Sequence, residues 1–242
     1  MKSIKAIGIV GYKNSGKTSL GLKLVSELEK RGYKVAVVKH ASEAIDLLDV
    51  DTSRYGKYVS QVAAVSVNNS AVFFREKKSL EDIIRYLDAD FFILEGFKKE
   101  RTFPKIVCLR TEEEAKKLFD GLQVCATMSP LLETKLRVPL FDITSDTERI
   151  AELVSRKAFK LPNLNCQACG YPSCYELGRK IVRGERSASS CPPLTPATQV
   201  SVEGKMLPLN PFISTIIANT LKGMLSALKG FRKGTIELTI EE

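Results

Sequence analysis

The sequence lacks a long apolar run, an internal repeat and a low-complexity tract. A helix that spans a membrane needs about eighteen or more consecutive apolar residues, and no segment of this chain approaches that length. Residues 1–5 lead directly into a strand-like segment and lack the apolar core of a signal peptide. We therefore expect a cytoplasmic protein with no membrane partner.

Positive charge is in excess but is not concentrated in one segment. The 242 residues include 37 Lys and Arg against 28 Asp and Glu, which gives a formal net charge of +9. Aromatic residues do not interleave with the basic ones, so the sequence does not favour a nucleic-acid partner. The excess charge suits anionic phosphate ligands or an acidic protein partner.

Strand-like and helix-like segments alternate from the N-terminus to about residue 158. The expected strands are residues 4–10, 35–38, 62–67, 71–74, 91–94, 106–109, 124–126 and 140–143. Residues 35–38 are expected to be a buried strand, and residues 68–70 (Asn-Asn-Ser) are expected to form a hairpin turn between 62–67 and 71–74. The expected helices are residues 18–31, 80–87, 112–119 and 147–157. Ser79, with Asp82 three residues later, is expected to begin the second of these helices as a partial capping box. Such alternation predicts an α/β fold in which a mainly parallel sheet is covered by helices on both faces.

The remainder of the chain predicts two smaller units. We expect a nucleotide-binding domain at 1–158, a four-cysteine module at 159–194 and a small α+β unit at 195–242. The last unit should contain a hairpin over 200–207 and a strand over 236–240. Its helix, over 212–228, carries an apolar stripe that we interpret as core, made of Ile213, Ile216, Ile217, Leu221, Met224, Leu225 and Leu228.

A phosphate-binding loop lies near the N-terminus, where residues 11–18 read Gly-Tyr-Lys-Asn-Ser-Gly-Lys-Thr. A buried strand precedes this G-x-x-x-x-G-K-T pattern and an amphipathic helix follows it, as a P-loop requires. Lys17 should reach the β- and γ-phosphates, and Thr18 should present its hydroxyl to Mg²⁺. The fold is therefore predicted to be that of a P-loop NTPase. The expected nucleotide-binding residues are Gly11, Lys13, Asn14, Ser15, Gly16, Lys17, Thr18, Ser19 and Arg54.

Other candidates follow two further strands. Glu95 ends an apolar strand and could hold the magnesium ion or orient the attacking water. Asp51 could also contact magnesium, and Arg54 could contact phosphate, since both follow the strand that ends near His40, the only histidine. An acid at a strand end and a polar run in a loop are also common on solvated surfaces, so both interpretations stay open.

These motifs together resemble one family. The P-loop, Lys39-His40, residues 51–54, residues 95–98 (Glu-Gly-Phe-Lys) and Pro104-Lys105-Ile106 occur in the order typical of molybdopterin-guanine dinucleotide biosynthesis protein B (MobB). The resemblance covers residues 1–158. It implies a protein that binds GTP and hydrolyses it weakly. From their places in the P-loop and at the strand end, Lys17 and Glu95 are the expected catalytic residues.

The same resemblance implies the partners. They are a molybdenum cofactor guanylyltransferase, which attaches GMP to molybdopterin, and the pterin cofactor as a second candidate. A guanine-reading Asn-Lys-x-Asp motif is not evident, so the choice of GTP rests on the resemblance alone. The sequence does not fix the oligomeric state, and a homodimer is compatible with it.

Four of the six cysteines crowd into one segment, at Cys166, Cys169, Cys174 and Cys191. In a cytosolic chain, such a group indicates a metal site rather than disulfides. Four thiolates suit either a [4Fe–4S] cluster or zinc, and the spacing favours the cluster. This segment resembles the iron–sulfur module of corrinoid and acetyl-CoA-pathway proteins. Cys108 and Cys125 lie alone in apolar strands and are expected in the core.

Two other functions stay open. One is a P-loop ATPase of iron–sulfur assembly or electron transfer, although those ATPases carry a lysine directly after the first glycine, where this chain has Tyr12. The other is a nucleotide-gated adapter whose hydrolysis is incidental.

Overall fold

The computed structural model describes residues 4–41, 54–55, 58–128, 136–194, 198–202, 205–232, 234 and 236. Asp51 and most of the strand expected over 236–240 lie outside these residues. None of the helices in the described part combines the length and the apolar character of a membrane span.

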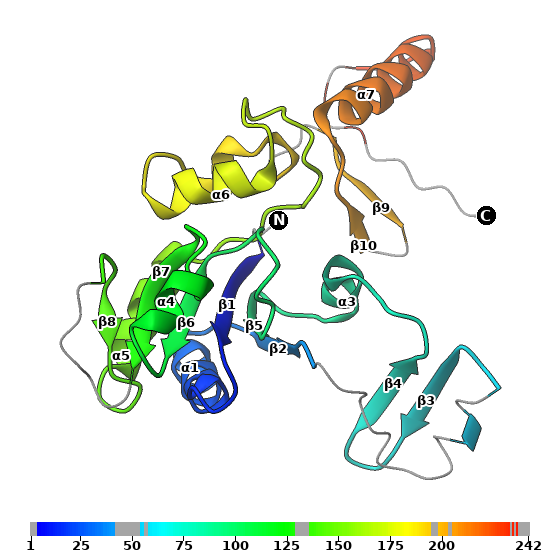
Figure 1. Cartoon of the computed structure of the whole chain (residues 1–242). Coiled ribbons are helices and arrows are strands. Elements are labelled where there is room, and N and C mark those ends of the chain that lie inside the picture. Colours follow the sequence, from blue (N-terminus) through cyan, green and yellow to red (C-terminus); the bar gives the residue numbers. More distant parts are fainter. Residues whose placement is uncertain are drawn as a thin grey trace.

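Six parallel strands form the central sheet, and every neighbouring pair in it is parallel (Figure 1). Their order is β2-β5-β1-β6-β7-β8. Strands β2 and β5 lie on one side of β1, and the later strands β6, β7 and β8 lie on its other side, so β1 lies where the strand order reverses. In open α/β sheets, this is where ligands bind. The strands are β1 (Lys5–Gly11), β2 (Val35–Lys39), β5 (Phe91–Glu95), β6 (Lys105–Leu109), β7 (Gln123–Met128) and β8 (Leu140–Phe141).

Helices cover both faces of the sheet, as the alternating pattern predicts. On one face, α1 (Lys17–Lys30) and α5 (Thr147–Lys157) bury Leu24 and Ile150 against Ile7 and Ile9 of β1. On the other face, α3 (Leu80–Tyr86) packs near Phe92, and α4 (Glu113–Leu118) packs near Val107. Each fully buried side chain of this size contributes roughly 1.5–3 kcal/mol, so the two apolar layers hold the sheet and its loops in place.

Strand β2 differs from the expectation of a buried strand. It lies at the edge of the sheet, and Val37 is 50 % exposed. An edge strand has only one neighbouring strand, so part of its surface stays exposed to solvent. The apolar composition of residues 35–38 does not reveal that they lie at an edge.

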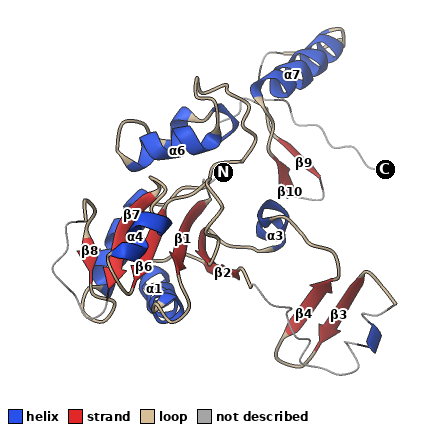
Figure 2. Cartoon of the chain, in the orientation of Figure 1, coloured by secondary structure: helices blue, strands red, loops and turns tan. Residues whose placement is uncertain are grey.

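Two antiparallel strands form a separate small sheet that lies apart from the main sheet (Figure 2). Strands β3 (Gln61–Val65) and β4 (Ser70–Phe74) form the predicted hairpin, closed by a turn in which the Ser66 hydroxyl bonds to Asn69. The predicted helix start at Ser79 is also confirmed, because Ser79 and Asp82 form a reciprocal capping box.

The C-terminal part contains α6, a hairpin and a long helix. They are α6 (Cys174–Val182), the short helices η1 (Ala188–Ser190) and η2 (Pro192–Leu194), β9 (Val200–Val202), β10 (Lys205–Leu207) and α7 (Pro211–Ser226). The interpretation of the α7 stripe as core is wrong for the described residues. Ile216 is 46 % exposed and Met224 is 67 % exposed, because α7 extends away from the sheet (Figure 1).

Candidate functional site

The P-loop joins β1 to α1 through a backbone that restricts its side chains. A Cβ atom at residue 11 would lie 2.5 Å from the carbonyl oxygen of Cys108, so only glycine fits where β1 ends. Gly16 has a φ angle of 83°, in the left-handed region that glycine favours. Asn14 is also left-handed, with a φ angle of 62°. The loop therefore folds back tightly before α1 begins.

The first turn of α1 presents an electropositive end. Its N-cap is Gly16, which has no side chain to accept from the backbone N–H groups, and the turn contains no acidic residue. The ammonium of Lys17 donates to the Tyr12 carbonyl oxygen at 2.5 Å. The buried Ser15 hydroxyl has no partner among the described residues. Backbone N–H groups, an ammonium and a hydroxyl are the groups that bind phosphate oxygens.

Glu95 lies beside this loop, at the end of β5. Parallel pairing places it opposite Ile9 of β1, so the carboxyl ends of the two strands meet. The Thr18 hydroxyl lies 3.1 and 3.3 Å from the two carboxylate oxygens of Glu95, and Lys39 Nζ lies 3.4 Å from one of them. Glu95 is only 7 % exposed. Because Mg²⁺ prefers oxygen ligands such as these, Thr18 and Glu95 fit a magnesium ion.

The other predicted residues of this site take different positions. Lys13 and Asn14 of the P-loop and Ser19 in the first turn of α1 are exposed to solvent. Arg54 is exposed in a short helical stretch over 54–55, and its role in phosphate binding stays a prediction. His40 is exposed, and its ring packs edge-on against Phe97 with the ring centroids 5.3 Å apart. That packing gives His40 a structural contact.

Sequence reasoning did not assign a role to Lys39 or Lys98, which both lie close to this site. Lys98 Nζ lies 4.3 Å from the centroid of the Tyr12 ring. Burial, and then the nearby charge of Lys17, lower the pKa of Lys98. The sequence could have indicated Lys98, because it is the last residue of the Glu-Gly-Phe-Lys motif that begins at Glu95.

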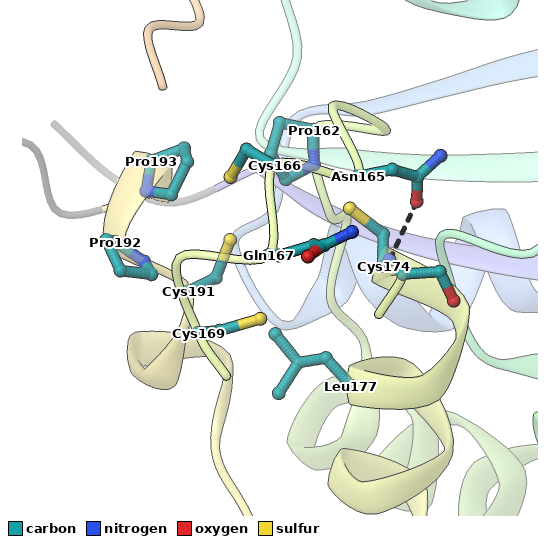
Figure 3. Close-up of a pocket in the computed structure, with 11 residues that line it drawn as sticks. Pro162, Asn165, Cys166, Gln167, Cys169, Cys174, Leu177, Cys191, Pro192 and Pro193 are labelled. Atoms are coloured by element: carbon teal, nitrogen blue, oxygen red, sulfur yellow. Dashed lines mark hydrogen bonds between the residues drawn. The ribbon is translucent and has the colours of Figure 1, made fainter. Parts of the chain in front are cut away.

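The four clustered cysteines line one pocket in the C-terminal part of the chain. Figure 3 shows the sulfur atoms of Cys166, Cys169, Cys174 and Cys191 arranged around the space between them. Cys174 is the first residue of α6, and its backbone N–H donates to the Asn165 side chain at 2.8 Å. The loop before α6 contains three left-handed residues, Asn163, Asn165 and Gln167, which fold it around the pocket.

The chemistry of this pocket suits a positively charged metal centre. Burial, followed by the charges of the other three cysteines, raises the pKa of Cys191 to about 12. Four thiolates cannot share such a space without cations to offset their repulsion. Leu177, Pro192 and Pro193 also line the pocket and make it partly apolar. The four thiols therefore fit an iron–sulfur cluster. In the described part of the chain, no group of three or more His, Cys, Asp or Glu residues is placed to hold a single metal ion.

The two isolated cysteines are core residues, as expected. Cys108 and Cys125 are fully buried in β6 and β7. Burial raises the pKa of Cys108 to about 11 and also raises the pKa of Cys125. Both thiols are therefore unreactive at neutral pH.

The four-cysteine segment packs against the main sheet near the start of β7. The Tyr175 hydroxyl donates to the carbonyl oxygen of Asp120, and the Arg101 guanidinium stacks 4.6 Å from the Tyr175 ring centroid. A Cβ atom at residue 178 would lie 3.1 Å from Leu122, so a glycine in α6 allows this close approach.

Two family models match the chain. Residues 6–129 match the family "Molybdopterin guanine dinucleotide synthesis protein B", and residues 161–193 match the family "Putative Fe-S cluster". The second match covers all four clustered cysteines. The two matches correspond to the two sites described above.

Similar proteins extend these matches. A protein of Methanocaldococcus jannaschii named "Putative molybdopterin-guanine dinucleotide biosynthesis adapter protein" is 32% identical over 236 residues, which are 94% of this chain and 93% of that protein. A Haemophilus influenzae "Molybdopterin-guanine dinucleotide biosynthesis adapter protein" is 35% identical over 117 residues, 45% of this chain and 65% of that protein.

A solved structure supports the fold. The crystal structure of Bacillus subtilis MobB covers 63% of this chain and 97% of its own, with a TM-score of 0.54 at 20% identity. The family match over residues 6–129 and the full-length likeness to the archaeal protein together establish the assignment. This chain belongs to the MobB family and carries a C-terminal iron–sulfur family segment.

Proposed function

We propose that this chain binds GTP with Mg²⁺ at its P-loop, hydrolyses it slowly and acts as an adapter in molybdopterin guanine dinucleotide biosynthesis. Its partner would be the guanylyltransferase that attaches GMP to molybdopterin, and the pterin is a second candidate ligand. Family membership supports the pathway, because its relatives are named as adapter proteins of that pathway. The preference for GTP follows from the family resemblance.

The observation that carries this proposal is the convergence of Lys17, Thr18 and Glu95 at the carboxyl ends of β1 and β5. Lys17 would neutralise the β- and γ-phosphates, and the N–H groups at the start of α1 would bind their oxygens. Thr18 and Glu95 would hold magnesium, which when bound offsets the phosphate charge. Glu95 would also orient a water molecule toward the terminal phosphate.

We also assign a [4Fe–4S] cluster to Cys166, Cys169, Cys174 and Cys191. The match of residues 161–193 to an iron–sulfur family and the common pocket of the four thiols support this assignment. We further propose three functional units, at 1–158, 159–194 and 195–242. The first binds the nucleotide, the second binds the cluster and the third is a small α+β unit.

Titration with a fluorescent GTP analogue tests the phosphate site. Lys17→Ala should weaken binding at least about tenfold, because it removes the ammonium from the phosphates. Lys116→Ala, which removes an exposed lysine from α4, is the matched control and should bind normally. Unchanged affinity in Lys17→Ala would overturn the phosphate site.

A non-catalytic role has one observation in its favour, since both relatives are named adapter proteins. In that case, GTP binding would gate the association with the transferase and hydrolysis would be incidental. Measuring GTP turnover with and without the partner transferase separates the two functions. Turnover that the partner does not stimulate favours the gated adapter.

A further inference from the structure

The loop after β5 brings a second lysine to the P-loop. Lys98 lies three residues after Glu95, and its ammonium is 4.3 Å from the ring centroid of Tyr12. Lys17 donates to the carbonyl oxygen of the same tyrosine at 2.5 Å. Two ammonium groups from different parts of the chain therefore approach one residue of the P-loop.

A buried ion pair fixes the backbone at Lys98. Lys105 is 1% exposed, and its ammonium donates to the Lys98 carbonyl oxygen at 2.9 Å and to the Asp120 carboxylate at 2.6 Å. Gly8 gives the Lys105 side chain its space, because a Cβ atom there would lie 3.2 Å from Lys105 Cγ. A buried ammonium keeps its oxygen partners, since losing one leaves the charge uncompensated. The loop is therefore held in place beside the P-loop.

Lys98 has no direct ion-pair partner among the described residues. The acid whose charge acts on it is Glu114, which is already paired with Arg110. Arg110 also lies near Tyr12, with its guanidinium 5.9 Å from the ring centroid, but it forms a salt bridge of 2.6 Å with Glu114. The charge of Lys17 contributes to the lowered pKa of Lys98. An anion placed between the two ammonium groups would relieve their repulsion.

We propose that Lys98 is a second cation for the terminal phosphate of the bound nucleoside triphosphate, and that Lys105 and Asp120 position it. This inference rests on the proposed triphosphate binding. The P-loop backbone surrounds the inner phosphates, whereas the terminal phosphate extends toward the acid that ends the neighbouring strand. That acid is Glu95, and Lys98 belongs to the loop that follows it. Lys98 therefore distinguishes a triphosphate from a diphosphate.

Paired titrations with GTP and GDP analogues in the presence of Mg²⁺ test this role. Lys98→Met should weaken triphosphate binding about tenfold and diphosphate binding much less, because only the triphosphate has the terminal group. Lys98→Arg keeps the charge and should restore most of the preference. Lys99→Met removes the neighbouring exposed lysine and is the matched control.

The positioning role is tested with Asp120→Asn. This variant should lower the ratio of triphosphate to diphosphate affinity, and the double variant with Lys98→Met should show no further decrease. A purely structural role would lower stability but leave the ratio unchanged, and an unchanged ratio in folded Asp120→Asn overturns the positioning role.

The failures of the two proposals are distinguishable. If the unmodified chain binds neither nucleotide, the proposed function fails and this inference fails with it. If the unmodified chain binds both and Lys98→Met weakens neither, or weakens both equally, only the role of Lys98 is overturned.

Discussion

The hydroxyl group of Thr18 donates a hydrogen bond to the carboxylate of Glu95 at 3.1 Å, although 77 residues separate the two in sequence. Thr18 lies in the first turn of α1, and Glu95 ends the adjacent strand β5. Parallel pairing of β1 with β5 therefore builds the candidate magnesium site.

Glu95→Gln should spare GTP binding and slow GTP hydrolysis at least about tenfold. The amide keeps the size and an oxygen, but it loses the negative charge that would hold magnesium and orient water. Hydrolysis is measured as phosphate release at saturating GTP, and affinity by titration. Glu148→Gln, an exposed acid on α5, should leave both unchanged. Loss of binding in a folded Glu95→Gln protein would show that the assigned role is wrong.

GTP should compete with labelled GTP far better than ATP does. This expectation comes from the family, since a P-loop contacts phosphates and does not read the base. The measurement is a competition titration with both nucleotides under identical magnesium. Equal competition by ATP would favour an ATPase of iron–sulfur assembly or electron transfer, while leaving the phosphate site intact.

Anaerobically purified protein should be brown and contain about four irons with matching sulfide per chain. Serine at Cys166, Cys169, Cys174 or Cys191 should lower that content, because a hydroxyl replaces a thiolate ligand. Cys125→Ala should keep it, since Cys125 lies in the sheet core. The measurements are metal analysis and the visible spectrum. Colourless protein with one tightly bound zinc would contradict the cluster while preserving the four ligands.

Tyr175→Phe should lower the free energy of unfolding by about 1 kcal/mol, the usual contribution of one hydrogen bond. The variant removes the hydroxyl that donates to the Asp120 carbonyl oxygen, while the ring can still stack with Arg101. Urea denaturation of equally metal-loaded proteins measures the change. Tyr58→Phe, at a position that is 87% exposed, is the control. Equal stability of the Tyr175→Phe and Tyr58→Phe variants would mean that this contact does not help to dock the module.

The sequence by itself determined the features that depend on residues close together in the chain. The P-loop, the capping box at Ser79, the hairpin of β3 and β4, and the alternation that gives a parallel sheet are all local patterns. The spacing of the four cysteines also indicated one site, because three of them lie within nine residues.

Only the tertiary structure decided which distant residues meet and which apolar faces are covered. The contact of Lys98 with Tyr12, and the burial of Lys105 against Asp120, depend on how the loops after β1, β5 and α4 pack together. The exposure of β2 and α7 was also decided by tertiary packing. An apolar pattern indicates which face of an element could be buried, but it does not indicate whether another element covers that face. Hydrophobic burial is non-directional, so local sequence cannot specify the partner of a face, whereas strand order and packing do.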